Sequence, residues 1–117
     1  MKHAEDDCQK AQVKYLTDRR RYKRDVMFCA VPNGGRRGKI EAARLIGLGV
    51  VPGAPDMIVW MKDRCICIEN KVRPNTPTAS QEAFGAGLTA LGFEYHVIAA
   101  TDPADAVDRL HRILGAA

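Results

Sequence analysis

Residues 55–71 read PDMIVWMKDRCICIENK, two apolar runs separated by a short charged segment. The runs MIVWMK and CICIENK have the composition of two strands joined by a tight turn. Three charged residues, Asp56, Glu69 and Lys71, lie among residues that otherwise resemble sheet interior. Charged side chains rarely stay in such places without partners, so these three are the first candidates for a functional site.

The register of this predicted hairpin decides where the charged side chains point. A two-residue loop at residues 63–64 would place Asp56 opposite Lys71. It would also place Ile58 opposite Glu69. Directly opposed residues project to one face of a sheet, as do residues two apart in a strand, so the three charged groups would converge. A three-residue loop would instead put Asp56 on the other face.

Two carboxylates and an ammonium on one face suit metal-dependent hydrolysis. Ionised Asp56 and Glu69 would repel each other, and Lys71 relieves only part of that repulsion. Mg²⁺ and Mn²⁺ prefer oxygen ligands, and either ion could polarise a phosphodiester and activate a water. Lys71 could then hold that water or stabilise the charge at phosphorus. A buried ion pair that only fixes strand register is the structural alternative, and these residues alone leave both open.

The composition indicates one globular domain, residues 1–117, because 46% of the residues are hydrophobic and 27% are charged. No stretch reaches the roughly 18 apolar residues of a membrane helix, and the first residues lack the apolar run of a signal peptide. We therefore expect a cytoplasmic protein with no membrane partner. The four cysteines include no C-x-x-C pair, which favours reduced, mostly buried thiols over a zinc site.

Positive charge is concentrated in the first third of the chain. Residues 1–39 hold 11 Lys and Arg against 5 Asp and Glu, whereas the remainder holds 7 against 9. A basic face of this kind suits a polyanion such as DNA. A charged helix surface that keeps the protein soluble accounts for the same numbers.

The hydrophobic pattern predicts the element order αβαββαβα. The expected helices are residues 5–21, 39–49, 80–91 and 103–114, and the expected strands are residues 25–31, 57–62, 65–71 and 95–100. Thr78 or Ser80 is a suitable N-cap for the third helix, and Asp102 for the last. Apolar strands with helices between them predict an α/β protein with a mixed central sheet covered by helices.

Five segments together resemble the VRR-NUC domain, the virus-type replication-repair nuclease of the PD-(D/E)xK superfamily. They are VPNGGRR at 31–37, ARLIGLGVVPGAPDMIVW at 43–60, IENK at 68–71, Ser80 with Gln81, and LGFEYHVI at 91–98. The resemblance extends over nearly the whole chain, from about Glu5 to Leu114. It implies a restriction-endonuclease-like fold with an αβββαβ core and a mixed central sheet flanked by helices, in agreement with the predicted order.

The resemblance also implies an activity. It implies a Mg²⁺- or Mn²⁺-dependent endonuclease that hydrolyses phosphodiester bonds in DNA, selective for branched DNA such as Holliday junctions. It further implies a homodimer of phage or bacterial origin. The implied catalytic residues are Asp56, Glu69, Lys71, Gln81 and Glu5, and the implied metal ligands are Asp56, Glu69, Glu5 and the backbone carbonyl of Asn70.

Several of these positions have simpler explanations or depart from the family pattern. Ala54 stands where the family more often has a branched or bulky residue, and Asn70 stands where Leu is frequent. Glu5 could be an exposed residue at a frayed helix end. Gln81 could merely cap its helix.

The glycine-rich loop is the candidate DNA-binding segment, because its backbone amides could cradle a phosphate among basic side chains. Its residues are Asn33, Gly34, Gly35, Arg36, Arg37 and Lys39. The same segment could be only a turn. We expect Trp60 in the core rather than as a base-stacking platform, and His96 as a structural residue of the last strand. The alternative function is a non-catalytic DNA-binding module with a nuclease-like fold.

Overall fold

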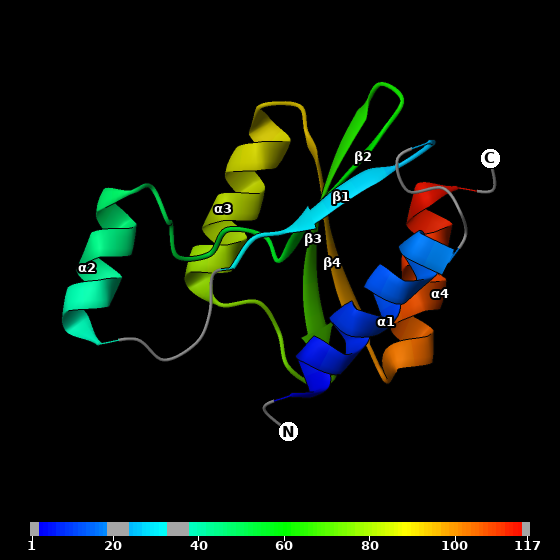
Figure 1. The fold of residues 1–117 in the computed structure, drawn as a ribbon, viewed down its shortest axis with the longest axis horizontal. Coiled ribbons are helices and arrows are strands. Elements are labelled where there is room, and N and C mark those ends of the chain that lie inside the picture. The colour runs from blue at the N-terminus through cyan, green and yellow to red at the C-terminus, as the bar shows by residue number, and fades with distance from the viewer. Residues whose placement is uncertain (1–2, 19–23, 33–37, 116–117) are drawn as a thin grey trace.

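The computed structural model describes residues 3–18, 24–32 and 38–115. Its elements follow the predicted order (Figure 1). The helices are α1 (Ala4–Asp18), α2 (Lys39–Gly47), α3 (Ala79–Ala90) and α4 (Pro103–Leu114), and the strands are β1 (Met27–Ala30), β2 (Met57–Met61), β3 (Arg64–Val72) and β4 (Glu94–Ala100). None of the described helices is long and apolar enough to span a membrane.

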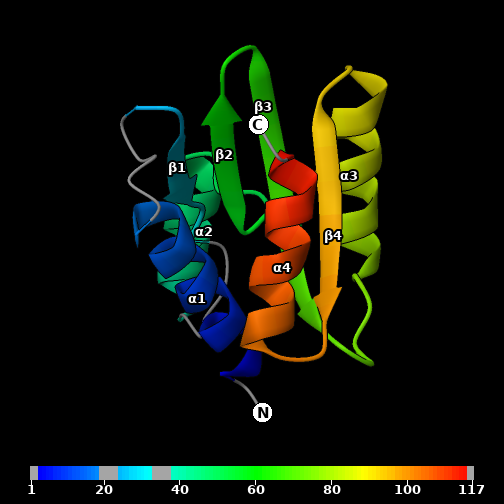
Figure 2. The same cartoon turned by 90° about the vertical axis from the view of Figure 1, so that its right-hand side faces the viewer.

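A mixed sheet in the order β1-β2-β3-β4 forms the middle layer. Its first three strands are antiparallel neighbours, whereas β4 runs parallel to β3 because α3 carries the chain back between them. Helices α1 and α4 pack together on one face of the sheet, and α3 packs against β4 on the other (Figures 1 and 2). The predicted mixed sheet flanked by helices is confirmed.

The apolar core lies between the sheet and the α1–α4 pair. Alternate residues of β2, β3 and β4 point into it, and in α4 the buried residues recur every four positions, so each of these elements presents one apolar face. The core residues are Cys8 and Leu16; Val26; Met57 and Val59; Ile66 and Ile68; Ile98 and Ala100; and Ala106, Leu110 and Leu114. Full burial of one such Leu or Ile side chain stabilises the fold by about 2 kcal/mol.

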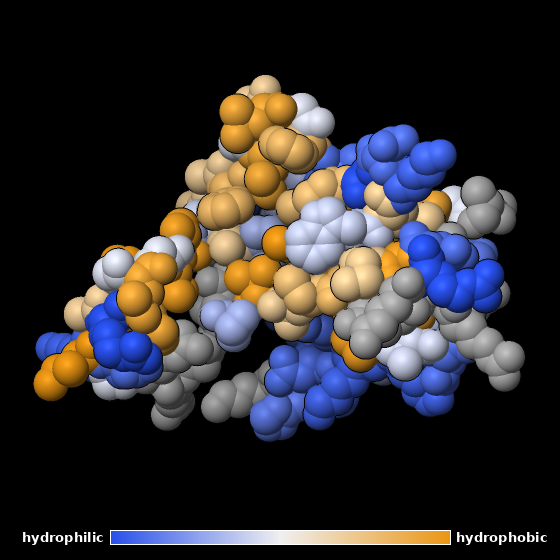
Figure 3. Space-filling view, turned by 45° about the horizontal axis from the view of Figure 1, so that its top comes forward, coloured by the Kyte–Doolittle hydropathy of each residue, from blue (hydrophilic) through white to orange (hydrophobic). Residues whose placement is uncertain are grey.

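Helix α2 stands apart from this core (Figure 1). It has no buried residue, and Ile40 and Ile46 are strongly exposed. Apolar side chains gather on its surface, as Figure 3 shows. Helix α2 therefore contributes little to the core, and the other elements set the geometry of the site described below.

The β2–β3 hairpin has the predicted loop length at a different position. Met61 pairs with Arg64, so the chain reverses at Lys62 and Asp63 rather than at residues 63–64. Asp63 has φ 61°, a left-handed conformation that Asp adopts more readily than most residues. The predicted loop position is thus wrong by one residue.

This correction changes the partners across the hairpin but not the faces. Ile58 lies opposite Cys67 instead of Glu69. Continued one residue beyond β2, the same register brings Asp56 opposite Glu69 rather than Lys71. Partners shift by two residues when the loop moves by one, and residues two apart in a strand share a face. Asp56, Glu69 and Lys71 therefore still share one face, as expected.

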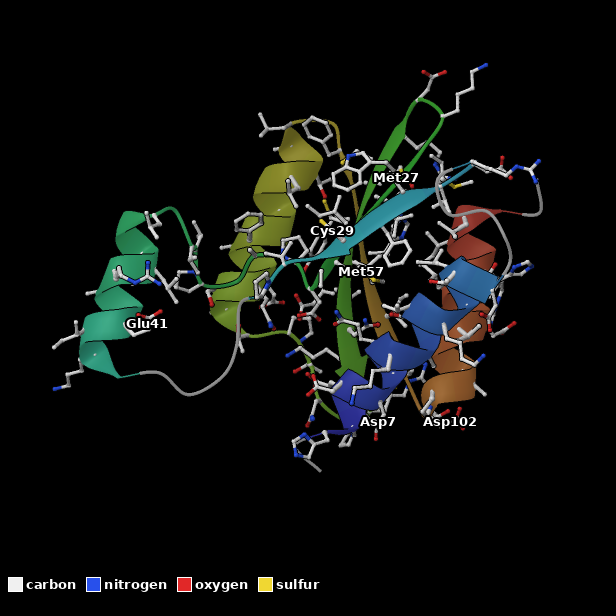
Figure 4. All side chains as sticks on the ribbon, viewed as in Figure 1. Asp7, Met27, Cys29, Glu41, Met57 and Asp102 are labelled. Atoms are coloured by element: carbon white, nitrogen blue, oxygen red, sulfur yellow. The ribbon has the colours of Figure 1, made fainter. Side chains whose placement is uncertain are left out.

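The second face of the sheet is only half covered. Trp60, expected in the core, is 40% exposed, and Met27 opposite it is 47% exposed. Helix α3 covers β4 and leaves the β1–β2 side of that face open, which is why the core prediction for Trp60 is wrong. Cys29, on the same face of β1 as Met27 (Figure 4), is exposed, so the expectation of mostly buried thiols holds for Cys8 and Cys67 only.

Candidate active site

A cleft of about 520 Å³ opens where β2 begins and β3 continues past it. Helix α1, the end of β1, the segment before β2, the end of β3 and the start of α3 all contribute to its wall. The lining residues are Glu5, Asp6, Gln9, Ala30, Val31, Pro32, Gly53, Ala54, Asp56, Glu69 and Gln81. Four of these carry carboxylates, and this described lining includes no Lys or Arg, so the cleft has a negative potential that favours cations.

Three hydrogen bonds hold Asp56, through its backbone N–H, its backbone carbonyl and its carboxylate. Its backbone N–H donates to the Ile68 carbonyl at 2.9 Å, and its carbonyl accepts from Val31 N at 2.8 Å. Its carboxylate Oδ2 accepts from the backbone N–H of Asn70 at 2.8 Å. The N–H and C=O of one strand residue point to the same side, so the Asn70 carbonyl also faces this open edge of β3. The edge therefore offers a carboxylate and a backbone carbonyl together.

Glu69 is almost completely buried, with 1% of its surface exposed. Its Oε2 accepts from Gln81 Nε2 at 2.9 Å, whereas its buried Oε1 has no hydrogen-bond donor among the described residues. Burial first, and the negative charge of Asp56 second, raise the pKa of Glu69 to about 8. Burial also raises the pKa of Asp56, although the Asn70 N–H opposes this effect. A buried carboxylate next to a half-buried one is costly unless a proton or a cation neutralises the charge.

Gln81 caps its helix, as one interpretation of its sequence position suggested, and also bonds the buried carboxylate of Glu69. Thr78, rather than Ser80, is the N-cap of α3, and its side chain accepts from the Gln81 backbone N–H. Gln81 Oε1 accepts from Thr78 N at 2.8 Å and completes this capping box. The remaining amide nitrogen donates to Glu69. The cap thus fixes the rotamer of the side chain that orients the buried carboxylate.

Lys71 lies two residues after Glu69 and therefore on the same face of β3. It is only 9% exposed, and its charge lowers the pKa of both Asp56 and Glu69. In the part of the chain that the structure describes, its ammonium forms no hydrogen bond or ion pair. The structural alternative, an ion pair that fixes strand register, would need such a contact with one of the two carboxylates.

Glu5 and Gln9 project from α1 onto the wall of the cleft. The charge of Glu5 raises the pKa values of Asp56 and Glu69, as a smaller cause than burial. Glu5 is half-buried, so the alternative of a fully exposed helix end does not hold. Within residues 3–18, 24–32 and 38–115, however, no three His, Cys, Asp or Glu side chains group closely enough to form a metal site.

The donors that are present still match a hard divalent cation. Mg²⁺ typically binds one or two carboxylates and completes its shell with water and phosphate oxygens. The Asp56–Glu69 pair, in which Glu69 Oε1 has no donor, could supply those carboxylates. The Asn70 carbonyl, on the β2 side of β3, could supply a third oxygen. This donor set contains only oxygen, which disfavours zinc, a metal usually bound through nitrogen or sulfur.

The candidate DNA-binding loop is described only at its ends. Asn33, Gly34, Gly35, Arg36 and Arg37 lie outside the described residues. Pro32, which precedes them, lines the cleft. Lys39, the first residue of α2, is exposed. The loop therefore begins at the cleft and leads to an exposed basic residue.

Two residues that matter for the site were not singled out from the sequence. Gly53 has φ 90°, and a Cβ there would lie 2.3 Å from the Ser80 carbonyl oxygen, so only glycine lets this segment pass the start of α3. Gln12 is completely buried and bonded to Asn70. Its signal in the sequence is a polar residue within the apolar stripe of α1.

His96 has the structural surroundings expected of it. It is half-buried in β4, and its Nε2 lies 3.3 Å from Glu94 Oε1. Both oxygens of Glu94 accept from Arg64 at 2.7 Å, and Arg64 also donates to backbone carbonyls at the end of α4. This group ties the β2–β3 hairpin to α4, and none of its three side chains lines the cleft.

No protein-family model matches the sequence, and no curated protein matches it. A solved structure described as a VRR_NUC domain protein has a similar fold, with a TM-score of 0.66. The match covers 93% of this chain and 86% of that chain at 20% sequence identity, a level at which the likeness concerns the fold alone. The chain therefore has a VRR-NUC-like fold of the restriction-endonuclease type, as the sequence resemblance implied.

Proposed function

We propose that this protein is a metal-dependent endonuclease that hydrolyses phosphodiester bonds in DNA. The observation that carries the proposal is the Asp56–Glu69 pair, in which Asp56 is half-buried, Glu69 is buried, and Glu69 Oε1 has no hydrogen-bond donor in the described structure. The pair lies in an acidic cleft of a nuclease-type fold. A buried carboxylate beside a half-buried one destabilises the fold, so the arrangement is best explained by a ligand that needs both of them.

The proposed ligand is Mg²⁺ or Mn²⁺. Asp56, Glu69 and the backbone carbonyl of Asn70 would hold it, and Glu5 on the cleft wall is the further oxygen donor that we propose. When bound, such a cation polarises the phosphodiester and makes a coordinated water a stronger nucleophile. It would also neutralise a cleft that otherwise repels DNA phosphates.

The chain's own residues have distinct proposed tasks. Gln81 keeps Glu69 Oε2 engaged, so that Oε1 stays available to the cleft. Lys71 donates hydrogen bonds to the attacking water or to a phosphate oxygen, and its positive charge stabilises the negative charge that builds up at phosphorus. Asp56, held on three sides, keeps the β2 and β3 groups in register.

DNA would be bound by groups outside the acidic cleft. We propose the glycine-rich loop, residues 33–37, and Lys39 for contacts with the phosphate backbone. Resemblance to stand-alone VRR-NUC proteins supports selectivity for branched DNA such as Holliday junctions. Symmetrical cutting of two strands needs two sites, so we also propose a homodimer, of phage or bacterial origin and acting in the cytoplasm.

Cleavage of a four-way junction and of a linear duplex tests this function. Each substrate is incubated with Mn²⁺, Mg²⁺ or EDTA and with wild type, Glu69→Ala, or the control Glu82→Ala, which changes an exposed carboxylate in the first turn of α3. We expect metal-dependent cleavage by wild type and by the control, and none by Glu69→Ala. Equal cleavage by wild type and Glu69→Ala with metal present would refute the nuclease proposal. Binding without cleavage would favour the non-catalytic DNA-binding module.

A further inference from the structure

A reciprocal amide pair joins α1 to the strand that carries the site residues. Gln12 Nε2 donates to Asn70 Oδ1 at 3.0 Å, and Asn70 Nδ2 donates to Gln12 Oε1 at 2.7 Å. Gln12 Nε2 also donates to the Ala106 carbonyl in α4 at 3.2 Å. Both side chains are almost completely buried, with 0% and 1% of their surfaces exposed. The pair therefore connects α1, β3 and α4 inside the core.

Burial alone does not call for two amides at these positions. Two apolar side chains of similar volume would pack there without hydrogen bonds to satisfy, and such exchanges are often neutral or stabilising. A buried amide instead tolerates one arrangement, because any shift that breaks its hydrogen bonds leaves polar groups without partners. The pair thus restricts how α1 can sit on β3.

Both residues of the amide pair are linked to groups of the candidate site. On the strand, Asn70 stands between Glu69 and Lys71, and its backbone N–H donates to Asp56. On the helix, Gln9 and Glu5 precede Gln12 by three and seven residues, which places all three on one side of α1. Gln9 and Glu5 line one wall of the cleft, and the β3 edge forms another.

We propose that Gln12 and the Asn70 side chain are positioning residues for the cation site. Their amide pair sets the distance between α1 and β3. It thereby fixes where Glu5 stands relative to the Asp56–Glu69 pair and holds the Asn70 backbone at the edge of the cleft. Any effect on cleavage rests on the proposed nuclease function, whereas the geometric claim does not.

Four variants separate positioning from packing. Gln12→Leu and Asn70→Leu each leave one buried amide without its partner, and the double Leu variant replaces the pair with apolar side chains. The exchange variant Gln12→Asn with Asn70→Gln keeps a reciprocal pair with the same total length. Ile66→Val is the matched control, since it weakens the core on the same face of β3 without touching the amides.

Mn²⁺ affinity by calorimetry and Tm are measured for every variant, at temperatures where each is folded. Residues that orient metal ligands typically change metal affinity by roughly 10- to 100-fold when replaced. We expect a loss of that size in both single Leu variants. In the double Leu variant Tm should recover while Mn²⁺ affinity and cleavage rate do not. The exchange variant should stay within a few-fold of wild type, and Ile66→Val should bind Mn²⁺ normally.

A purely structural pair would behave differently, because Mn²⁺ affinity would then return with Tm in the double Leu variant. That result would overturn the proposal. Hydrogen exchange of the backbone amide at residue 70, which donates to Asp56, provides a readout that needs no metal. We expect this amide to exchange at least tenfold faster in the double Leu variant than in Ile66→Val. Unchanged exchange of this amide would refute the positioning proposal, whether or not wild type binds Mn²⁺ or cleaves DNA. A wild type that neither binds Mn²⁺ nor cleaves DNA would refute only the nuclease proposal.

Discussion

Replacing Glu69 with glutamine should stabilise the metal-free protein at neutral pH. The pKa of Glu69 is raised from 4.5 to about 8 in the folded protein, mainly by burial. At about 1.36 kcal/mol per pKa unit, this shift corresponds to about 5 kcal/mol in full, of which roughly 3 kcal/mol acts at pH 7. The amide introduced by Glu69→Gln is neutral at every pH. Its oxygen can still accept from Gln81, and its nitrogen can donate to Asp56.

The sign of the pH dependence follows from the direction of the shift. Below the ordinary pKa, both folded and unfolded chains carry a protonated Glu69, and the substitution gains nothing. As pH rises from about 4.5 to about 8, the unfolded chain releases its proton first, so wild type loses stability relative to Glu69→Gln. Above about pH 8 the difference is constant. We expect a gain of about 1–3 kcal/mol at pH 7, because the new amide does not reproduce every contact of the carboxyl group.

Thermal unfolding in EDTA at pH 4, 6 and 8 measures this gain. For a chain of this length, 1 kcal/mol changes Tm by roughly 4 °C. Glu82→Gln is the matched control, because the same chemical change is then made at an exposed position of α3. A lower Tm for Glu69→Gln at pH 7 in EDTA, or an equal effect at pH 4 and pH 8, would show that the buried carboxylate does not destabilise the fold as its raised pKa implies.

Three further changes test other parts of the account. Lys71→Met should lower the single-turnover cleavage rate at saturating Mn²⁺ by roughly 10²–10³-fold without weakening Mn²⁺ binding, because a positive charge that stabilises the transition state is lost. Weaker Mn²⁺ binding with an unchanged rate would contradict that role. Arg64 lowers the pKa of Glu94 to about 2, so this pair stabilises wild type above about pH 4.5 and the stability is lost as pH falls toward 2. Chemical denaturation should accordingly show a deficit for Arg64→Met at pH 7 that shrinks toward pH 2, whereas a constant deficit would refute the titration argument. Gly53→Ala should cost about 1–3 kcal/mol in the same assay, because its Cβ meets the Ser80 carbonyl and φ is positive; unchanged stability would show that the segment has room to move.

The order of the elements could be predicted from the hydrophobic pattern because apolar residues recur at strand or helix spacing in each segment, even in α2 and β1, which contain no buried residue. The position of the hairpin loop could not, since charged residues occupy all of residues 62–64 and any two of them could form the turn. The left-handed conformation of Asp63 places the loop at residues 62–63. Trp60 was misplaced for a different reason: strand composition does not tell how far along the sheet α3 extends.

The candidate site was predictable where its residues are close in sequence or match the nuclease pattern. The shared face of Glu69 and Lys71 follows from their spacing alone. The double role of Gln81 required the structure, because capping and carboxylate binding use different atoms of the same amide. The bond between Gln12 and Asn70 spans 58 residues and has no local pattern, so a polar residue in an apolar stripe was its only trace.

Anomalous diffraction from crystals of the wild-type protein grown with Mn²⁺ tests the central claim most directly. If Asp56 and Glu69 hold the cation, a manganese peak should lie at about 2.0–2.2 Å, the distance typical of small divalent cations, from one oxygen of each. The same peak should be missing from crystals of Asp56→Asn grown under the same conditions. A wild-type structure with no peak between the two carboxylates, and with Lys71 in an ion pair with them instead, would contradict the account.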